Sequence, residues 1–330
     1  MGDAIPHPGR TFVIAILSLA LASCSDSQPL HHPLTPLSNI QLPKESKVPA
    51  LDLLTLDPRV GRLYVAHSSI SSMDVIDVKT GKLAGSVPGV PGIKGIALTG
   101  DPNLVFASQT TGVVSAIDVA QLKVLAAIDV GRGPDAIEYD SVDDLVAVSL
   151  STDLKIALVD PKTRKLIGTI PFVGGPELMS IDQHTGRIFL AINDRDQVVQ
   201  IDIAARTVTK TYKGCDIKAP TGVAYDADDG RLFVASRGAL NIIDVVLDRC
   251  LGSVDIGSGT DQIAYSSHTH HVYTADGGSK YLSVIDAVTM KPLGTVGTGR
   301  SAATLAIDPT TDRIYVAVKP AGIIAVYHDP

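Results

Sequence analysis

Acidic side chains recur along this sequence at a spacing of about 42 residues. Asp52, Asp135, Glu177 and Asp261 each lie one position before a short apolar run, and Lys94 occupies the same place in another repeat. If the repeats form a closed ring, these groups stand around one opening. Carboxylate oxygens are the ligands that Ca²⁺ prefers. The spacing therefore predicts an acidic mouth that could hold a divalent cation, Ca²⁺ first, with Asp135 and Glu177 as ligands because their repeats adjoin.

Other polar residues are expected beside the same opening. His67 and Asp276 directly follow the second apolar run of their repeats, and Arg195 and Arg237 lie in the loops after that run. These groups could act as ligands or as rim contacts for a bound molecule. The alternative is that the rim is polar because water covers it. No paired metal-ligand spacing such as Glu-x-x-His accompanies these residues, which favours that alternative.

A second set of carboxylates has a structural interpretation. These aspartates end apolar runs and are followed by turn residues, as in DVKTGK, DPKTRK and DAVTMK. An aspartate in this position accepts hydrogen bonds from backbone N–H groups of its own turn. Copies distributed around a ring cannot converge on one substrate. We therefore predict a turn-closing role for Asp77, Asp118, Asp160, Asp202, Asp244 and Asp286.

Charge and missing motifs exclude several function classes. The formal net charge is −7 and no basic run occurs, so nucleic acid is not an expected partner. The sequence contains no Cys-x-x-Cys-His, Gly-x-Ser-x-Gly, phosphate loop or His-Glu-x-x-His. His268, His270 and His271 fall in a turn expected on the face away from the mouth. We interpret them as surface histidines, with metal binding as the alternative.

Short strands in a regular repeat must position these residues. Hydrophobic residues make up 45% of the chain, and 29 Gly and 20 Pro interrupt the apolar runs, as is typical of an all-β protein. β-branched and aromatic runs recur in phase: RLYVA, LVFAS, LVAVS, RIFLA, RLFVAS, HVYTA and RIYVAV. A repeat of about 42 residues with four short strands is one blade of a propeller. Residues 38–330 are therefore predicted to form a single seven-bladed β-propeller.

The last repeat has only three strands before Pro330, and a spare strand precedes the first repeat at Asn39–Leu42. We predict that this N-terminal strand completes the last blade and closes the ring. Closure removes two open sheet edges, which would otherwise pair with other chains. The closed ring is expected to be monomeric.

The N-terminus has the pattern of an export signal. Arg10 precedes an apolar stretch, Thr11–Ala22, that is too short to span a bilayer, which needs about 20 residues. The stretch ends in Leu-Ala-Ser-Cys, which resembles the bacterial lipobox, with Cys24 as the lipidated first residue of the mature protein. An ordinary secretory signal with an incidental Cys24 is the alternative. We predict a signal peptide over residues 1–23 and a lipidated, flexible tether over residues 24–37.

The remaining cysteines, Cys215 and Cys250, are predicted to be free and largely buried. Export favours a disulfide. However, Cys215 is expected in a loop on the mouth face and Cys250 at the opposite end of a strand of about 20 Å. A disulfide tolerates only about 7 Å between Cα atoms.

The phased strands resemble the YVTN-type propeller repeat family, which includes many bacterial periplasmic proteins. The resemblance covers about residues 38–330 and rests on Tyr64-Val65-Ala66, Phe233-Val234-Ala235 and Tyr315-Val316-Ala317, with the Val/Ile-Ile-Asp strands and Gly-x-x-Pro loops in support. The Asn that ends the family motif is absent from all the repeats, so its role in relatives cannot be transferred.

Two function classes remain open, and no catalytic residue is assigned. The first is a non-catalytic binding or scaffolding propeller, lipid-anchored at the bacterial cell envelope. Its mouth face would bind an envelope protein, a glycan or a small molecule. The alternative, implied by the resemblance, is a lactonase-like hydrolase. Such an enzyme would need a base and a positive group at the mouth, for which His67, Glu177, Arg195 and Arg237 are the candidates.

Overall fold

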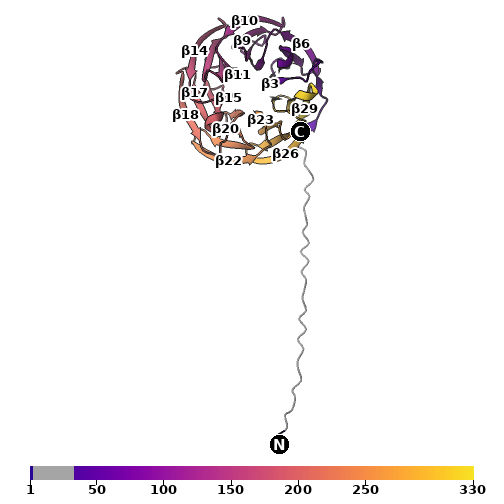
Figure 1. Ribbon diagram of the computed structural model, residues 1–330, viewed down its shortest axis with the longest axis vertical. Helices are drawn as coiled ribbons and strands as arrows, with labels where there is room; N and C mark the ends of the chain where they lie inside the picture. Colours follow the sequence, from indigo (N-terminus) through magenta and orange to yellow (C-terminus); the bar gives the residue numbers. More distant parts are fainter. Residues whose placement is uncertain (3–32) are drawn as a thin grey trace. The chain divides into compact units, whose positions relative to one another are not determined.

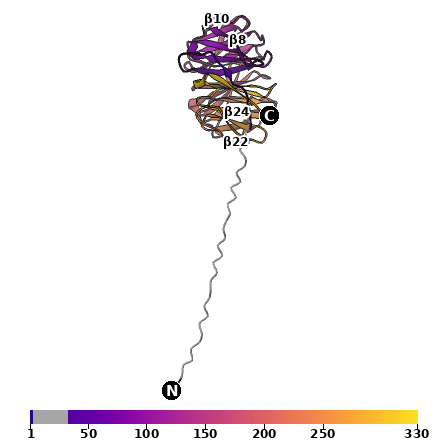
Figure 2. The same ribbon diagram turned by 90° about the vertical axis from the view of Figure 1, so that its right-hand side faces the viewer.

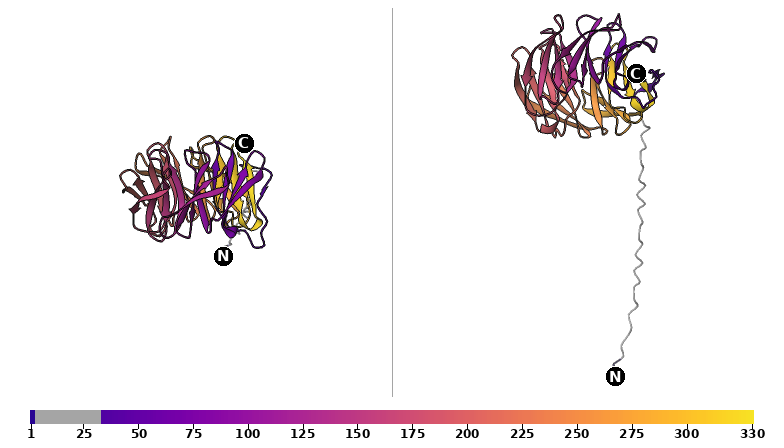
Figure 3. Two further views of the ribbon diagram at one scale, coloured as in Figure 1. Left: turned by 90° about the horizontal axis from the view of Figure 1, so that it is seen from above. Right: turned by 45° about the horizontal axis from the view of Figure 1, so that its top comes forward.

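Seven antiparallel sheets surround a common axis in residues 33–330 of the computed structural model, which also describes residues 1–2 (Figure 1). In each sheet, or blade, the strands follow one another from the axis to the periphery. The predicted all-β seven-bladed propeller is therefore confirmed. Figure 2 and the left view of Figure 3 show the ring from the side, with loops at both faces. No helix in the described residues is long and apolar enough to cross a membrane.

The blades are numbered in chain order. The innermost strands are β3 (Leu51–Asp57), β7 (Ile93–Ala97), β11 (Pro134–Asp140), β15 (Pro176–Asp182), β19 (Val223–Asp226), β23 (Thr260–Ser266) and β27 (Leu305–Asp308). The second strands are β4 (Arg62–His67), β8 (Leu104–Gln109), β12 (Leu145–Leu150), β16 (Arg187–Ile192), β20 (Arg231–Ser236), β24 (His271–Asp276) and β28 (Arg313–Val318).

The third strands are β5 (Ser72–Asp77), β9 (Val113–Asp118), β13 (Lys155–Asp160), β17 (Gln197–Asp202), β21 (Ala239–Asp244), β25 (Tyr281–Asp286) and β29 (Ile323–His328). The outermost strands of the first six blades are β6 (Lys82–Pro88), β10 (Lys123–Asp129), β14 (Lys165–Pro171), β18 (Thr207–Lys213), β22 (Arg249–Asp255) and β26 (Lys291–Gly297). The second and third strands are almost wholly buried, because a neighbouring blade covers each of their faces. Their sequences are therefore continuous apolar runs, whereas an outermost strand such as β10 alternates between more and less exposed residues.

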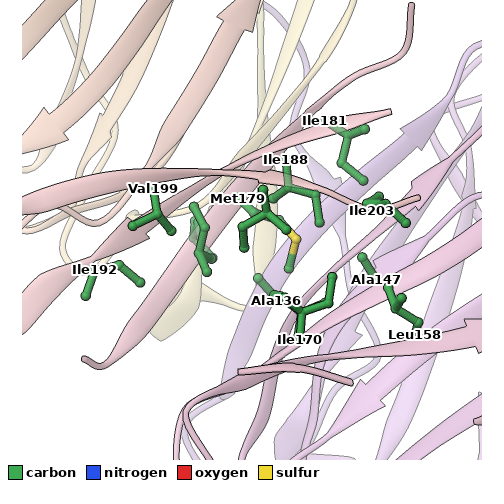
Figure 4. Close-up of a cluster of buried hydrophobic side chains, with 14 of the residues drawn as sticks. Ala136, Ala147, Leu158, Ile170, Met179, Ile181, Ile188, Ile192, Val199 and Ile203 are labelled. Carbon is green, nitrogen blue, oxygen red and sulfur yellow. The ribbon is translucent and has the colours of Figure 1, made fainter. Parts of the chain in front are cut away.

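Each boundary between neighbouring blades has its own cluster of buried apolar side chains. Figure 4 shows the cluster between blades 3 and 4, where Ala136 and Ile170 of one blade meet Met179 and Ile188 of the next. Burial of an isoleucine or methionine side chain contributes about 1.5–3 kcal/mol to the stability of the fold. The ring is therefore stabilised by contacts between adjacent repeats, as in other repeat proteins.

The N-terminal segment closes the ring. Two short strands, β1 (Thr35–Pro36) and β2 (Ile40–Gln41), both pair antiparallel with β29 of blade 7. Ile40 joins the cluster between blades 7 and 1, and Leu34 joins the one between blades 6 and 7. Closure by the N-terminal strand is confirmed, but the propeller begins earlier than residue 38. The expected tether over residues 24–37 is correspondingly shorter at its C-terminal end, and the expected signal peptide and Cys24 lie outside the described part of the chain, except for residues 1–2.

The turn aspartates have the predicted structural role. Asp77 Oδ1 accepts hydrogen bonds from the backbone N–H groups of Lys79 and Thr80, at 2.9 and 3.1 Å. These backbone donors hold the pKa of Asp77 below its usual range. The same contact recurs in the turns after β9, β13, β17, β21 and β25.

Cys215 and Cys250 form a disulfide, so the prediction of two free, largely buried thiols is wrong. Their Cα atoms lie 5.4 Å apart. The prediction placed Cys215 at the rim of the mouth face, but the long loop after β18 folds back along blade 5. There the side-chain amide of Asn241, in the middle of β21, donates a 2.6 Å hydrogen bond to the Cys215 carbonyl. Cys250 is exposed and Cys215 is half-buried.

Candidate functional site at the channel mouth

A shift in strand register positions the residues of the channel mouth. In five of the innermost strands, the pairing with the second strand is interrupted near the start, for example between Pro134 and Ile137 of β11. Such a bulge changes the direction in which the local side chains point. The residues inside these irregularities include Asp52, Lys94, Asp135, Glu177 and Asp261.

Lys94 joins three blades at the mouth. Its Nζ lies 3.0 Å from Asp52 Oδ2 on β3 and 3.6 Å from Asp135 Oδ1 on β11. Burial raises the pKa of Asp52, although the Lys94 charge opposes this shift. The ammonium group of Lys94 thus already occupies the position between Asp52 and Asp135 that a bound cation would take.

Glu177 and Asp261 are the carboxylates at the mouth that remain without a partner. Neither side chain makes a hydrogen bond or ion pair with the described residues. Burial, together with the charges of Asp135 and Asp261, raises the pKa of Glu177 to about 7. Burial and the nearby Asp52 charge raise the pKa of Asp261 to about 6. These mutual effects mean that acidic groups from blades 1, 3, 4 and 6 face one opening.

Lys319 is a further basic residue at this opening. It begins the short 3₁₀ helix η3 (Lys319–Ala321), directly after β28. Its charge lowers the pKa of Asp52 and of Asp261, against the larger effect of burial. Lys319 directly follows β28, as Ser68 directly follows β4. Alignment of the repeats could therefore have identified Lys319.

His67 is held inside blade 1. It is fully buried, and its Nδ1 lies 2.7 Å from Asp74 Oδ2 while its Nε2 lies 2.8 Å from Glu45 Oε1. Burial opposes protonation, but the hydrogen bonds to both carboxylates outweigh it and raise the pKa of His67. Because both ring nitrogens are occupied, His67 is not positioned to act as a base or ligand at the mouth.

Asp276 also has a structural environment. It is fully buried and accepts hydrogen bonds from the hydroxyls of Thr260, Thr274 and Ser283 and from the backbone N–H of Gly257. These contacts connect β23, β24 and β25 with the loop before β23. The carboxylate therefore ties the strands of blade 6 together and is not directed to the channel mouth.

Arg195 and Arg237 lie in exposed loops. Arg195 ends the 3₁₀ helix η2 (Asn193–Arg195), and its Nε lies 3.8 Å from Asp194 Oδ2. The backbone N–H of Arg237 bonds to the Lys218 carbonyl, which anchors its loop, while the residue itself is exposed. With His67 enclosed in blade 1, the residues that the lactonase hypothesis requires are not assembled at the mouth.

The carboxylates of the mouth are spread around the opening. In residues 1–2 and 33–330, no group of three or more His, Cys, Asp or Glu side chains is arranged to hold a metal ion. Ca²⁺ binding by Asp135 and Glu177 stays a prediction. Because Lys94 pairs with Asp135, the mouth carboxylates that have no basic partner among the described residues are Glu177 and Asp261.

Two cavities lie among the innermost strands. One has a volume of about 230 Å³ and the other about 440 Å³, and Glu138, Gln262 and Ala264 line both. Sequence analysis did not identify Glu138 or Gln262. The available signal was a charged residue inside the apolar run of β11, PDAIEYD.

Comparison with known proteins supports the fold alone. No protein-family model matches the sequence, and a search of curated proteins finds no match. Among solved structures, the chain is similar to hydrazine synthase of Kuenenia stuttgartiensis, with a TM-score of 0.78 and 16% sequence identity. The similarity covers 86% of this chain and 96% of the hydrazine synthase chain. It therefore extends over nearly the whole propeller.

Proposed function

We propose that this protein is a non-catalytic binding propeller whose channel mouth binds a cationic ligand between Glu177 and Asp261. The observation that carries this proposal is the pair of carboxylates with no partner among residues 33–330, at an opening where Lys94 already neutralises Asp52 and Asp135. Like charges held close together disfavour ionisation unless a cation is present. A bound cation would restore the charged form of both groups, and Ca²⁺ is the first inorganic candidate.

We also propose that the protein is exported and lipid-anchored at the bacterial cell envelope, with repeats of the YVTN type. Support comes from the signal-like sequence that ends at Cys24 and from the disulfide. Disulfides persist in oxidising compartments and are rare in the cytosol. The tyrosine or phenylalanine of the repeated strand is fully buried between blades, as at Tyr64 and Phe233.

Thermal melting tests the mouth. We expect millimolar Ca²⁺ to raise the Tm relative to EDTA, because a ligand that binds only the folded state stabilises it by about 2.7 kcal/mol at a hundred times its Kd. Glu177→Gln should remove most of this shift. Asp228→Asn makes the same change of charge in the exposed turn after β19 and should leave the shift intact. An equal Ca²⁺ response in the wild type and Glu177→Gln would place the metal elsewhere.

A further inference from the structure

A carboxylate connects blade 7 to blade 6. Asp329, directly after β29, is buried, and its Oδ2 lies 2.6 Å from Nδ1 of His271 at the start of β24. The hydroxyl of Tyr273, two residues further along β24, donates a hydrogen bond to the same oxygen. Two polar groups of blade 6 therefore meet one carboxylate oxygen, which the next blade supplies.

Blade 7 repeats the blade 6 side of this arrangement. Arg313 and Tyr315 of β28 have the register of the histidine and tyrosine just described. The place of Asp329 is taken by Val78, which directly follows β5 in blade 1. Val78 and Tyr315 belong to the same cluster of buried side chains between blades 7 and 1. Blade 7 thus has groups that can meet a carboxylate, but an aliphatic side chain lies opposite them.

The hydroxyl of Tyr315 has no hydrogen-bond partner within the described residues, although the residue is only 1% exposed. Burial raises the pKa of Tyr315, and the nearby Arg313 charge opposes this shift. The Asp308 carboxylate is also near, but the hydroxyls of its own turn occupy it. A buried polar group without a partner is costly. Arg313 and Tyr315 therefore form a donor set like the one that Asp329 contacts in blade 6.

A cavity of about 290 Å³ lies beside Tyr315, where blade 7, blade 1 and the N-terminal closing segment meet. Its charged lining residues, Arg313 and Lys79, are both basic, and neither forms an ion pair with the described residues. Leu37 and Val326 add apolar groups to the wall, and Leu37 is exposed. The cavity therefore combines positive charge with apolar contacts.

We propose that this cavity binds a small aliphatic carboxylic acid, whose carboxylate contacts Arg313 and the hydroxyl of Tyr315. The carboxylate takes the place that Asp329 has against blade 6, and the short chain lies against Leu37. A guanidinium group binds a carboxylate through strong, charge-assisted hydrogen bonds. Since the Tyr315 hydroxyl is shielded from solvent, binding requires the half-buried Arg313 side chain to turn toward the ligand. This site is separate from the channel mouth and does not depend on the proposed function.

Ligand-observed NMR titration with sodium hexanoate tests this proposal, and hexan-1-ol is the uncharged control with the same chain. We expect hexanoate to bind the wild type at least about tenfold more tightly than hexanol does, because of its charge-assisted hydrogen bonds. Tyr315→Phe should weaken hexanoate binding at least about threefold. It should not lower the Tm, since phenylalanine holds this position in blades 2, 4 and 5. Tyr64→Phe removes an equally unpartnered hydroxyl in blade 1 and should leave hexanoate binding unchanged.

Val78→Asp is a second, independent test. The substitution would supply from the chain itself the carboxylate that Asp329 supplies to blade 6, so hexanoate should bind no more tightly than hexanol. Val119→Asp makes the same change directly after β9 in blade 2 and should leave hexanoate binding intact. Melting curves establish that each variant folds.

Three outcomes would overturn the site. They are equal affinities of hexanoate and hexanol for the wild type, unchanged hexanoate binding in Tyr315→Phe or Val78→Asp, and an equal loss in Tyr64→Phe.

Discussion

The imidazole of His67, at the end of β4, joins β5 to the loop between β2 and β3. Asp74 comes from β5 and Glu45 from the loop, and both contact the ring through short hydrogen bonds. Ser69 also donates a hydrogen bond to Glu45, at 2.9 Å. The imidazole therefore fixes the segment that connects the closing strands to the first blade.

Replacing His67 by Leu should destabilise the protein by about 3 kcal/mol, because Asp74 and Glu45 lose their shared partner. The measurement is urea unfolding of both proteins. His184→Leu provides the control, since the His184 side chain is 71% exposed. If His67→Leu lowers the free energy of unfolding by no more than His184→Leu does, the contacts of His67 with Asp74 and Glu45 do not stabilise the fold.

The His67 effect should also depend on pH. The hydrogen bonds to its carboxylate partners outweigh burial, so the pKa of His67 is raised in the folded state. The stabilisation is fully present below the unfolded-state pKa of about 6.5 and is lost as pH rises through the folded value. The difference in the free energy of unfolding between the wild type and His67→Leu should therefore decrease from pH 6 toward alkaline pH.

Cys24→Ser tests the proposed anchor. The wild-type protein should be recovered in the membrane fraction, because several acyl chains on one cysteine hold a soluble domain at a bilayer. The variant should lack lipid and leave that fraction, with an unchanged Tm for the propeller. Wild-type protein found without lipid in the soluble periplasmic fraction would show that the motif is not a lipobox.

The position of a single residue could be predicted where the same position recurs from one repeat to the next. Asp52, Lys94 and Asp135 could be aligned by spacing, and Lys94 contacts both aspartates. His67 could not be placed in this way, because its partner Glu45 lies outside the repeats in the connecting loop. Glu138 was missed because one charged residue in an apolar run has no counterpart in the other blades.

At the scale of elements, the loop after β18 shows how a single long connection changes local structure. It runs along blade 5 and is fixed by the disulfide to the outermost strand β22. The bulges of the innermost strands likewise determine which residues face the channel. Strand positions follow from apolar periodicity, whereas that periodicity does not specify where a strand bulges or which path a loop takes.

Removing the disulfide should destabilise blade 5. Cys215 and Cys250 are separated by 35 residues, and a crosslink over this distance contributes about 3–4 kcal/mol by restricting the unfolded chain. We expect the double serine variant to lose this amount in denaturant unfolding. Intact mass before and after reduction should differ by two hydrogens in the wild type. Absence of that difference would restore the prediction of free thiols.

At the scale of the whole molecule, stability depends on closing the ring. Leu34, which directly precedes β1, and Ile40 of β2 lie in the two interfaces on either side of blade 7. The seven-bladed fold was predictable because the repeat specifies both blade length and strand order. Closure could be predicted because the last repeat has only three strands and a further strand precedes the first repeat.

A variant that starts at Lys44 should therefore melt well below one that starts at residue 33. Leu34, Ile40 and Leu42 are buried, and each contributes about 1.5–3 kcal/mol. We expect the Tm to fall by at least about 5 °C. Differential scanning calorimetry and size-exclusion chromatography measure the change. Two monomeric proteins that melt within a degree or two would show that closure adds little.

The pairing of β1 with β29 also sets an order of events during folding. Thr35 and His328 are direct neighbours in the sheet, although they lie at opposite ends of the propeller sequence. Bringing distant segments together costs chain entropy, and folds rich in such contacts form slowly. During synthesis β1 emerges first, yet its partner emerges last. The first six blades consist of strands that are consecutive in the sequence, whereas the last blade can be completed only after β29 has been made.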